Sequence, residues 1–287
     1  MSLTDSQARP VRLAAPPANA DCPWELFDPD RYLQHNYGEL RPPDQTIIKH
    51  VGRFFAAQRA LRERSGRQWH GIDVGSGTNL YPALAMLPLA STITLWEHSA
   101  TNVAWLERET RPYRRSWEPF WGVLVAAADM YRRLARPDEA LSAAVKVEKA
   151  SVFHLPEAQW DMGTMFFVAE SITGRRAEFE SATRRFLRSL KPGAPFVAAF
   201  MENSRGYSVG DQQFPAVAIT ERDLRPVLRE LTSASKIHHI APQQQLRDGY
   251  DGMILVTGIT RAHPSRRFLV LSGVGTRLVR ALRHRSR

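Results

Sequence analysis

The stretch Ile72-Asp73-Val74-Gly75-Ser76-Gly77 carries an apolar run into a glycine-rich turn, and a helix is predicted just after it. Glycines in such a turn let a ligand approach the main chain closely. Glu97 follows 22 residues after Gly75, at the end of the next predicted strand, where a carboxylate can accept hydrogen bonds from ribose hydroxyls. A dinucleotide-binding motif would have a third glycine where this chain has Leu80. The pattern favours a nucleoside ligand without phosphates, and a strand, turn and helix without a ligand is the alternative.

Outside this turn, predicted strands and helices alternate along the chain. Strands are predicted at residues 69–74, 92–96, 144–149, 161–168, 195–201, 236–241 and 252–259, and helices at 44–63, 81–87, 177–190 and 221–231. Such alternation is typical of an α/β fold with a doubly wound, mostly parallel sheet. Because no helix separates the last two strands, they predict an antiparallel edge strand.

The composition is that of an ordinary globular protein: of 287 residues, 43% are hydrophobic and 24% charged. No apolar run reaches the length of a membrane span, and Cys22 is the single cysteine, which excludes an internal disulfide and a cysteine-based zinc site. The histidines show no metal-binding spacing, so no metal is expected. We expect a cytoplasmic protein without a secretory leader.

The net charge of +10 is concentrated at one end of the chain. Seven arginines fall in residues 266–287, with no acid among them. We divide the chain into a flexible arm (1–20), one folded domain (21–262) whose residues 21–64 form an N-terminal lid, and an arginine-rich extension (263–287). The extension is either a solvated tail or a short amphipathic helix that contacts RNA, a membrane or another subunit.

Four stretches resemble the nicotinamide, phenylethanolamine and thioether S-methyltransferase family of class I S-adenosylmethionine-dependent methyltransferases. They are the glycine turn with Tyr81; Phe27-Asp28-Pro29-Asp30-Arg31-Tyr32-Leu33 with Tyr37; Leu190-Lys191-Pro192-Gly193; and Tyr207-Ser208-Val209-Gly210-Asp211-Gln212-Gln213-Phe214. The resemblance runs from about residue 23 to 260. It implies the Rossmann-like seven-stranded fold, a lid over the cofactor, and S-adenosyl-L-methionine as that cofactor.

The same resemblance implies roles for individual residues. The cofactor would be bound by Tyr32, Tyr37, Gly75, Ser76, Gly77, Tyr81, Glu97, Asn102 and Glu148. Tyr81 would contact its carboxylate and Glu97 its ribose, although the family usually has Asp at the latter position. Several of these residues have a simpler alternative role, because the tyrosines could be packing residues and Glu97 a solvated strand end.

Two acids, Glu170 and Glu202, follow predicted strands at the sheet edge where open α/β folds bind their ligands. In the phenylethanolamine branch of the family, acids at the matching positions hold the substrate amine. We therefore expect Glu170 and Glu202 to bind the substrate and take up its proton, with Tyr207 and Asp248 as further substrate contacts. Each acid could instead be a helix-initiating or surface residue.

These observations favour a small-molecule methyltransferase that acts on the nitrogen of an aromatic or alkyl amine. The first alternative keeps the enzyme and changes the acceptor atom to carbon, oxygen or sulfur of a specialised metabolite. An RNA-binding protein or RNA methyltransferase is a further alternative suggested by the basic tail. Val168-Ala169-Glu170-Ser171 stands where base methyltransferases of this fold carry an Asn-Pro-Pro-Tyr-type motif, which makes nucleic acid an unlikely partner. A cofactor-binding pseudoenzyme is the remaining alternative, and the oligomeric state stays open.

Overall fold

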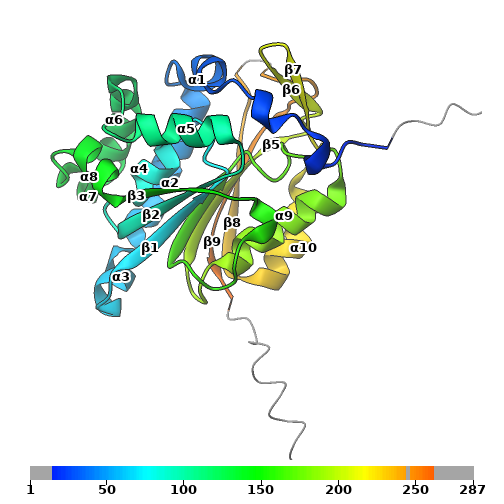
Figure 1. The fold of residues 1–287 in the computed structure, drawn as a ribbon. Coiled ribbons are helices and arrows are strands. Elements are labelled where there is room, and N and C mark those ends of the chain that lie inside the picture. The colour runs from blue at the N-terminus through cyan, green and yellow to red at the C-terminus, as the bar shows by residue number, and fades with distance from the viewer. Residues whose placement is uncertain (1–14, 244–245, 262–287) are drawn as a thin grey trace, which may run out of the picture.

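The computed structural model describes residues 15–243 and 246–261, and a seven-stranded sheet forms its centre (Figure 1). The strands stand in the order β3-β2-β1-β4-β5-β9-β8. They are β1 (Trp69–Val74), β2 (Ala90–Glu97), β3 (Val145–Lys149), β4 (Met162–Phe166), β5 (Pro195–Glu202), β8 (Thr232–Ile240) and β9 (Gly252–Thr260). The β1–β5 strands pair in parallel, whereas β9 runs antiparallel to both β5 and β8. The predicted doubly wound sheet with an antiparallel pair at one edge is therefore confirmed.

Helices cover both faces of the sheet (Figure 1). They are α1 (Pro29–Tyr37), α2 (Pro42–Ala57), α3 (Arg59–Ser65), α4 (Tyr81–Met86), α5 (Ala100–Glu109), α6 (Glu118–Ala127), α7 (Asp129–Arg132), α8 (Pro137–Ala144), α9 (Arg176–Ser189) and α10 (Glu221–Leu231). One apolar core joins α2, α4, α5 and α6 to the sheet, and a second joins α9 and α10 to its other face. Short 3-10 turns lie at Asn19–Asp21, Trp24–Leu26, Arg115–Trp117 and Val152–His154.

The sequence of α10 shows why these elements form where they do. Leu224, Val227, Leu228 and Leu231 recur at helical spacing and all are buried against the sheet. Thr220 precedes the helix, and the Asp223 carboxylate accepts from its backbone N–H at 2.8 Å, which closes a capping box. The predicted helix over residues 44–63 is instead two helices, α2 and α3, which meet at Gln58.

The N-terminal segment differs from the flexible arm expected over residues 1–20. Residues 15–20 pack against the loop before α9: the Pro17 carbonyl accepts from the Gly174 N–H at 2.8 Å, and Glu178 accepts from the Asn19 N–H at 2.8 Å. The chain is tied down here because proline carbonyls and a carboxylate pair with the backbone of neighbouring segments. Residues 1–14 and the arginine-rich extension (263–287) lie outside the described residues.

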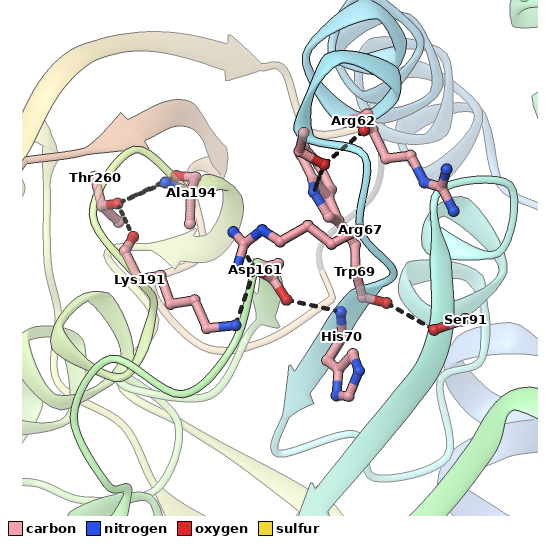
Figure 2. Close-up of polar contacts among 10 residues, drawn as sticks. Arg62, Arg67, Trp69, His70, Ser91, Asp161, Lys191, Ala194 and Thr260 are labelled. Carbon is pink, nitrogen blue, oxygen red and sulfur yellow. Dashed lines mark hydrogen bonds and ion pairs between the residues drawn. The ribbon is translucent and has the colours of Figure 1, made fainter.

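One edge of the sheet, where β1, β4 and β5 begin, is closed by polar contacts (Figure 2). The Asp161 side chain is 3% exposed, and its Oδ1 forms ion pairs with Arg67 Nη2 at 3.1 Å and with Lys191 Nζ at 2.9 Å. Its Oδ2 accepts from the His70 N–H at 3.0 Å. Since these partners precede or begin three strands, the cluster fixes the strand starts relative to one another.

In the described ranges, no helix combines the length and apolar character needed to cross a bilayer.

Candidate functional site

A cleft lies at the opposite edge, where β1, β2 and β4 end. It encloses about 770 Å³ of empty space, part of it open to solvent. Its walls come from six parts of the chain, around residues 19–37, 75–79, 96–102, 150–152, 166–172 and 207. The lining residues are Asn19, Trp24, Phe27, Tyr32 and Tyr37; Gly75, Ser76, Gly77, Thr78 and Asn79; Trp96, Glu97, His98 and Asn102; Ala150, Ser151 and Val152; Phe166, Phe167, Val168, Ser171 and Ile172; and Tyr207.

The glycine turn forms the floor of this cleft, and its glycines are required there. Gly75 has φ +64° and Gly77 has φ +52°, conformations that L side chains rarely adopt. A Cβ at Gly75 would also lie 2.6 Å from Val168, a side chain of the cleft wall. The Gly75 N–H donates to the Trp96 carbonyl at 2.7 Å, so the turn is tied to the end of β2. A small, rigid backbone surface therefore faces the cleft.

Glu97 lies at the end of β2 with its carboxylate held by backbone donors. Its Oε1 accepts from the N–H groups of His98 and Ser99, both at 2.8 Å, and its Oε2 accepts from the Gly77 N–H at 2.9 Å. Burial raises the pKa of Glu97, while these backbone hydrogen bonds oppose the shift. Because Oε2 accepts one hydrogen bond here, it can accept another from a ligand hydroxyl. Asn102 also faces the cleft, and its Oδ1 is buried without a hydrogen-bond partner among the described residues.

Aromatic side chains from two distant segments form a cover over the cleft. Trp24 stacks on Phe214 at 5.1 Å between ring centroids, and the Tyr32 ring meets the Tyr207 ring edge-on at 6.2 Å. Phe214 and Tyr207 belong to a hairpin of β6 (Gly206–Val209) and β7 (Gln212–Pro215). Figure 1 shows α1 and this hairpin at the same end of the sheet. We call α1, the 3-10 turn at Trp24–Leu26 and the β6–β7 hairpin the cover.

Of the predicted cofactor residues, Tyr32, Tyr37, Gly75, Ser76, Gly77, Glu97 and Asn102 line the cleft together. Two others do not. Tyr81 is 1% exposed and sits behind Tyr37, and its hydroxyl donates to Asp44 at 3.3 Å. Glu148 is on β3, and its Oε1 forms an ion pair with the Lys146 Nζ at 2.5 Å. Tyr81 is turned inward because its ring packs among Tyr37, Phe120 and Phe166 in the core.

The two predicted substrate acids lie apart, because side chains alternate along β5. Met201 points to the core beneath α2, so its neighbour Glu202 points to the α10 face. There Glu202 meets His239 at 3.4 Å and borders a separate surface hollow. The expectation that Glu202 and Glu170 bind the same substrate amine therefore needs correction. Tyr207 lines the cleft, whereas Asp248 is exposed and borders a neighbouring hollow that shares Tyr207 with the cleft.

Glu170 is wholly buried at the end of β4, directly behind the cleft wall. Its Oε1 accepts from the Met201 N–H at 3.0 Å and from the Ser171 hydroxyl at 3.2 Å, while its Oε2 has no hydrogen-bond partner among the described residues. Burial raises the pKa of Glu170 to about 7, and the positive charge of Arg247 partly opposes this shift. Ser171 lines the cleft and separates Glu170 from it.

Several residues that line the cleft were not predicted from the sequence. Phe167 has φ +60°, a strained conformation for an aromatic residue, and faces the cleft. Ser171 could have been found from its place beside Glu170, but Asn19 and Trp24 carry no local signal, because they reach the cleft only through the packing of the N-terminal segment. No group of three metal-ligating side chains occurs within the part of the chain that the structure describes.

Comparison with protein families gives a match over residues 20–258 to the NNMT/PNMT/TEMT family. The chain belongs to this family. It is a class I S-adenosylmethionine-dependent methyltransferase, and its cofactor is S-adenosyl-L-methionine, as the resemblance of its motifs implied. No curated protein matches the sequence.

Several solved structures are similar in fold. A Burkholderia thailandensis 1,6-didemethyltoxoflavin-N1-methyltransferase, solved with 1,6-didemethyltoxoflavin and S-adenosylhomocysteine, is 16% identical; the match covers 73% of this chain and 78% of that one at a TM-score of 0.41. A Methanosarcina mazei S-adenosylmethionine-dependent methyltransferase is 12% identical over 68% of this chain and 93% of that one, with a TM-score of 0.45. The N-methyltransferase NodS from Bradyrhizobium japonicum is 11% identical over 73% and 88%, with a TM-score of 0.41.

Proposed function

We propose that this methyltransferase binds its cofactor in the cleft and methylates the nitrogen of a small-molecule amine. The cleft residues suit S-adenosylmethionine, which supplies a methyl group carried on a sulfonium sulfur. Gly75 and Gly77 leave backbone room that a Cβ would occupy, Glu97 has a spare acceptor position for a ribose hydroxyl, and Asn102 has an unpartnered buried oxygen. The aromatic rings of Tyr32 and Tyr37 would cover the cofactor and exclude water.

Glu170 carries the proposal for the acceptor. A protonated amine must lose a proton before its nitrogen lone pair can attack the methyl group, and a carboxylate whose pKa is about 7 can accept that proton near neutral pH. Ser171 connects the two, because it lines the cleft and its hydroxyl donates to Glu170 at 3.2 Å. Ser171 can therefore accept a proton from the nitrogen while its own hydrogen passes to the carboxylate. Glu202 is left out of this proposal because it faces α10.

The proposal is tested by Glu170→Gln, with Glu202→Gln as the matched control at the end of the next strand. With an amine acceptor, we expect Glu170→Gln to lower kcat/KM by about 10- to 150-fold, the equivalent of losing a charge-assisted hydrogen bond and proton acceptor. Glu202→Gln should change kcat/KM less than about threefold, as surface substitutions do. Wild-type kcat/KM should fall as the pH drops through about 7, because Glu170 then binds a proton.

The affinity for S-adenosylhomocysteine should stay unchanged in both variants, since neither carboxylate lines the cleft. A panel of amines, phenols, thiols and carbon nucleophiles identifies the acceptor atom. Turnover of a phenol, thiol or carbon acceptor alone, with no effect of Glu170→Gln, would contradict the amine proposal. Failure of the wild-type protein to bind S-adenosylhomocysteine would contradict the proposed cofactor cleft itself.

A further inference from the structure

Arg247 lies outside the cleft lining but contacts three cleft residues from three separate parts of the chain. It sits in the turn between β8 and β9, and it is 7% exposed. The three cleft residues are Tyr32 of α1, Ser171 of the loop after β4 and Tyr207 of strand β6. We infer that Arg247 is a positioning residue that holds the cover closed on the cleft. This inference rests on the cofactor cleft proposed above.

The contacts of Arg247 connect the cover to the sheet. Its Nη1 donates to the Ser171 hydroxyl at 2.8 Å, and its Nη2 donates to the Tyr32 hydroxyl at 3.3 Å. The guanidinium carbon lies 4.3 Å from the centre of the Tyr207 ring, within the range of a cation–π contact. Ser171 is fixed to the sheet through Glu170, whose Oε1 also accepts from the Met201 N–H of β5. One side chain thus ties the two halves of the cover to the end of the central strands.

This arrangement uses properties that are specific to arginine. A guanidinium presents several N–H donors in one plane, so two of them can reach Ser171 and Tyr32 while the flat face stacks on Tyr207. A lysine ammonium is a compact charge that cannot make these three contacts in the same geometry. The positive charge alone would therefore not hold the cover, and Arg247→Lys separates the two effects.

The consequence concerns how long a ligand stays in the cleft. Tyr32 and Tyr207 form one of the ring contacts between the N-terminal segment and the hairpin, and both line the cleft. If Arg247 holds them in place, its loss leaves the cover free to open, and a bound ligand escapes faster. Association needs an open cover, so its rate should not fall. The expected signature is a faster dissociation rate with an unchanged association rate.

The experiment measures S-adenosylhomocysteine association and dissociation by stopped-flow fluorescence, using the full-length wild type, Arg247→Met, Arg247→Lys and Arg205→Met. Arg205 is the matched control because, like Arg247, it borders the hollow beside Asp248, and because its side chain is exposed. We expect dissociation to be about tenfold faster in Arg247→Met, corresponding to one charge-assisted hydrogen bond, and about as fast in Arg247→Lys. Arg205→Met should lie within about twofold of the wild type.

Tyr32→Phe gives a second test that removes one hydroxyl and keeps the ring. It should speed dissociation by about threefold in the wild type and have a smaller effect in Arg247→Met, because the two changes remove the same hydrogen bond. Wild-type dissociation rates in Arg247→Met, or full rescue by Arg247→Lys, would overturn the inference. If Arg247→Met does not fold, an unchanged rate in Tyr32→Phe overturns it. A wild-type protein that does not bind S-adenosylhomocysteine would overturn the cleft, whereas equal rates in binding-competent variants overturn only the role of Arg247.

Discussion

Two buried carboxylates at opposite edges of the sheet differ in how their oxygens are used. Asp161, where β4 begins, receives two cations and a backbone N–H, so both of its oxygens are occupied (Figure 2). Glu170, just beyond the end of the same strand, has two donors on Oε1 and none among the described residues on Oε2. The same residue chemistry is therefore fully partnered at one edge and incompletely partnered at the other.

This difference indicates what each edge does. Partners that neutralise a buried carboxylate stabilise the fold but leave nothing for a ligand to bind. Asn102 Oδ1, at the cleft, and Asp73 Oδ2, at the end of β1, also lack partners among the described residues, as do hydroxyls elsewhere in the fold. Asn102 Oδ1 can pair with a ligand because Asn102 lines the cleft, whereas Glu170 does not line it, and its unpaired oxygen leaves that carboxylate able to take up a proton. We therefore assign stability to the Asp161 edge and chemistry to the Glu170 edge.

The largest expected effect follows from removing the partnered carboxylate. Asp161→Ala should lower the free energy of unfolding by about 2–3 kcal/mol, because the His70 N–H and the two cations lose a charged acceptor. The penalty stays moderate because the Arg67 side chain is 60% exposed and can return to water. Denaturant unfolding measures the loss. Turnover per folded molecule should be unchanged, and a selective loss of kcat would contradict the division between the two edges.

A somewhat smaller effect is expected from the unpartnered carboxylate, and it depends on pH. The pKa of Glu170 is raised to about 7 in the fold from an ordinary value of 4.5. The protonated form is therefore favoured in the folded state, and stability is lost as the pH rises from about 4.5 through 7. Glu170→Gln does not titrate, so its stability relative to the wild type should improve by about 2 kcal/mol between pH 5 and pH 8. A difference that stays constant over this range would contradict the raised pKa.

The fold could be predicted from sequence because its signals are local. The apolar run before Gly75, the breaker Lys191-Pro192-Gly193 after α9, and the helical spacing within α10 each depend on neighbouring residues alone. All seven predicted strands occur in the sheet. The packing of residues 15–20 could not be predicted in this way, because Pro17 and Asn19 pair with Gly174 and Glu178, more than 150 residues away.

The site could be predicted only in part for the same reason. Gly75, Gly77 and Glu97 belong to one strand-turn-helix-strand unit, so their spacing already places them together. Whether Glu202 faces the cleft depends on which face of β5 it occupies, and a shift of one residue reverses the answer. Arg247 gives no sequence signal at all, because Tyr32, Ser171 and Tyr207, which it contacts, are distant from it along the chain.

The smallest expected effect concerns a carboxylate that lies at the same end of the sheet as the cleft but does not line the cleft. Glu148 lies near the end of β3, beside β2, but its Oε1 is on Lys146 at 2.5 Å and its side chain is 33% exposed. We therefore expect Glu148→Gln to change the dissociation constant for S-adenosylhomocysteine by less than about twofold. Glu97→Gln, the same change on the adjacent strand, should weaken binding by about tenfold or more, because a charged acceptor is lost from the cleft. Isothermal titration calorimetry measures both constants. An equal loss in the two variants would mean that position at this end of the sheet, and not a place in the cleft lining, determines which carboxylates bind the cofactor.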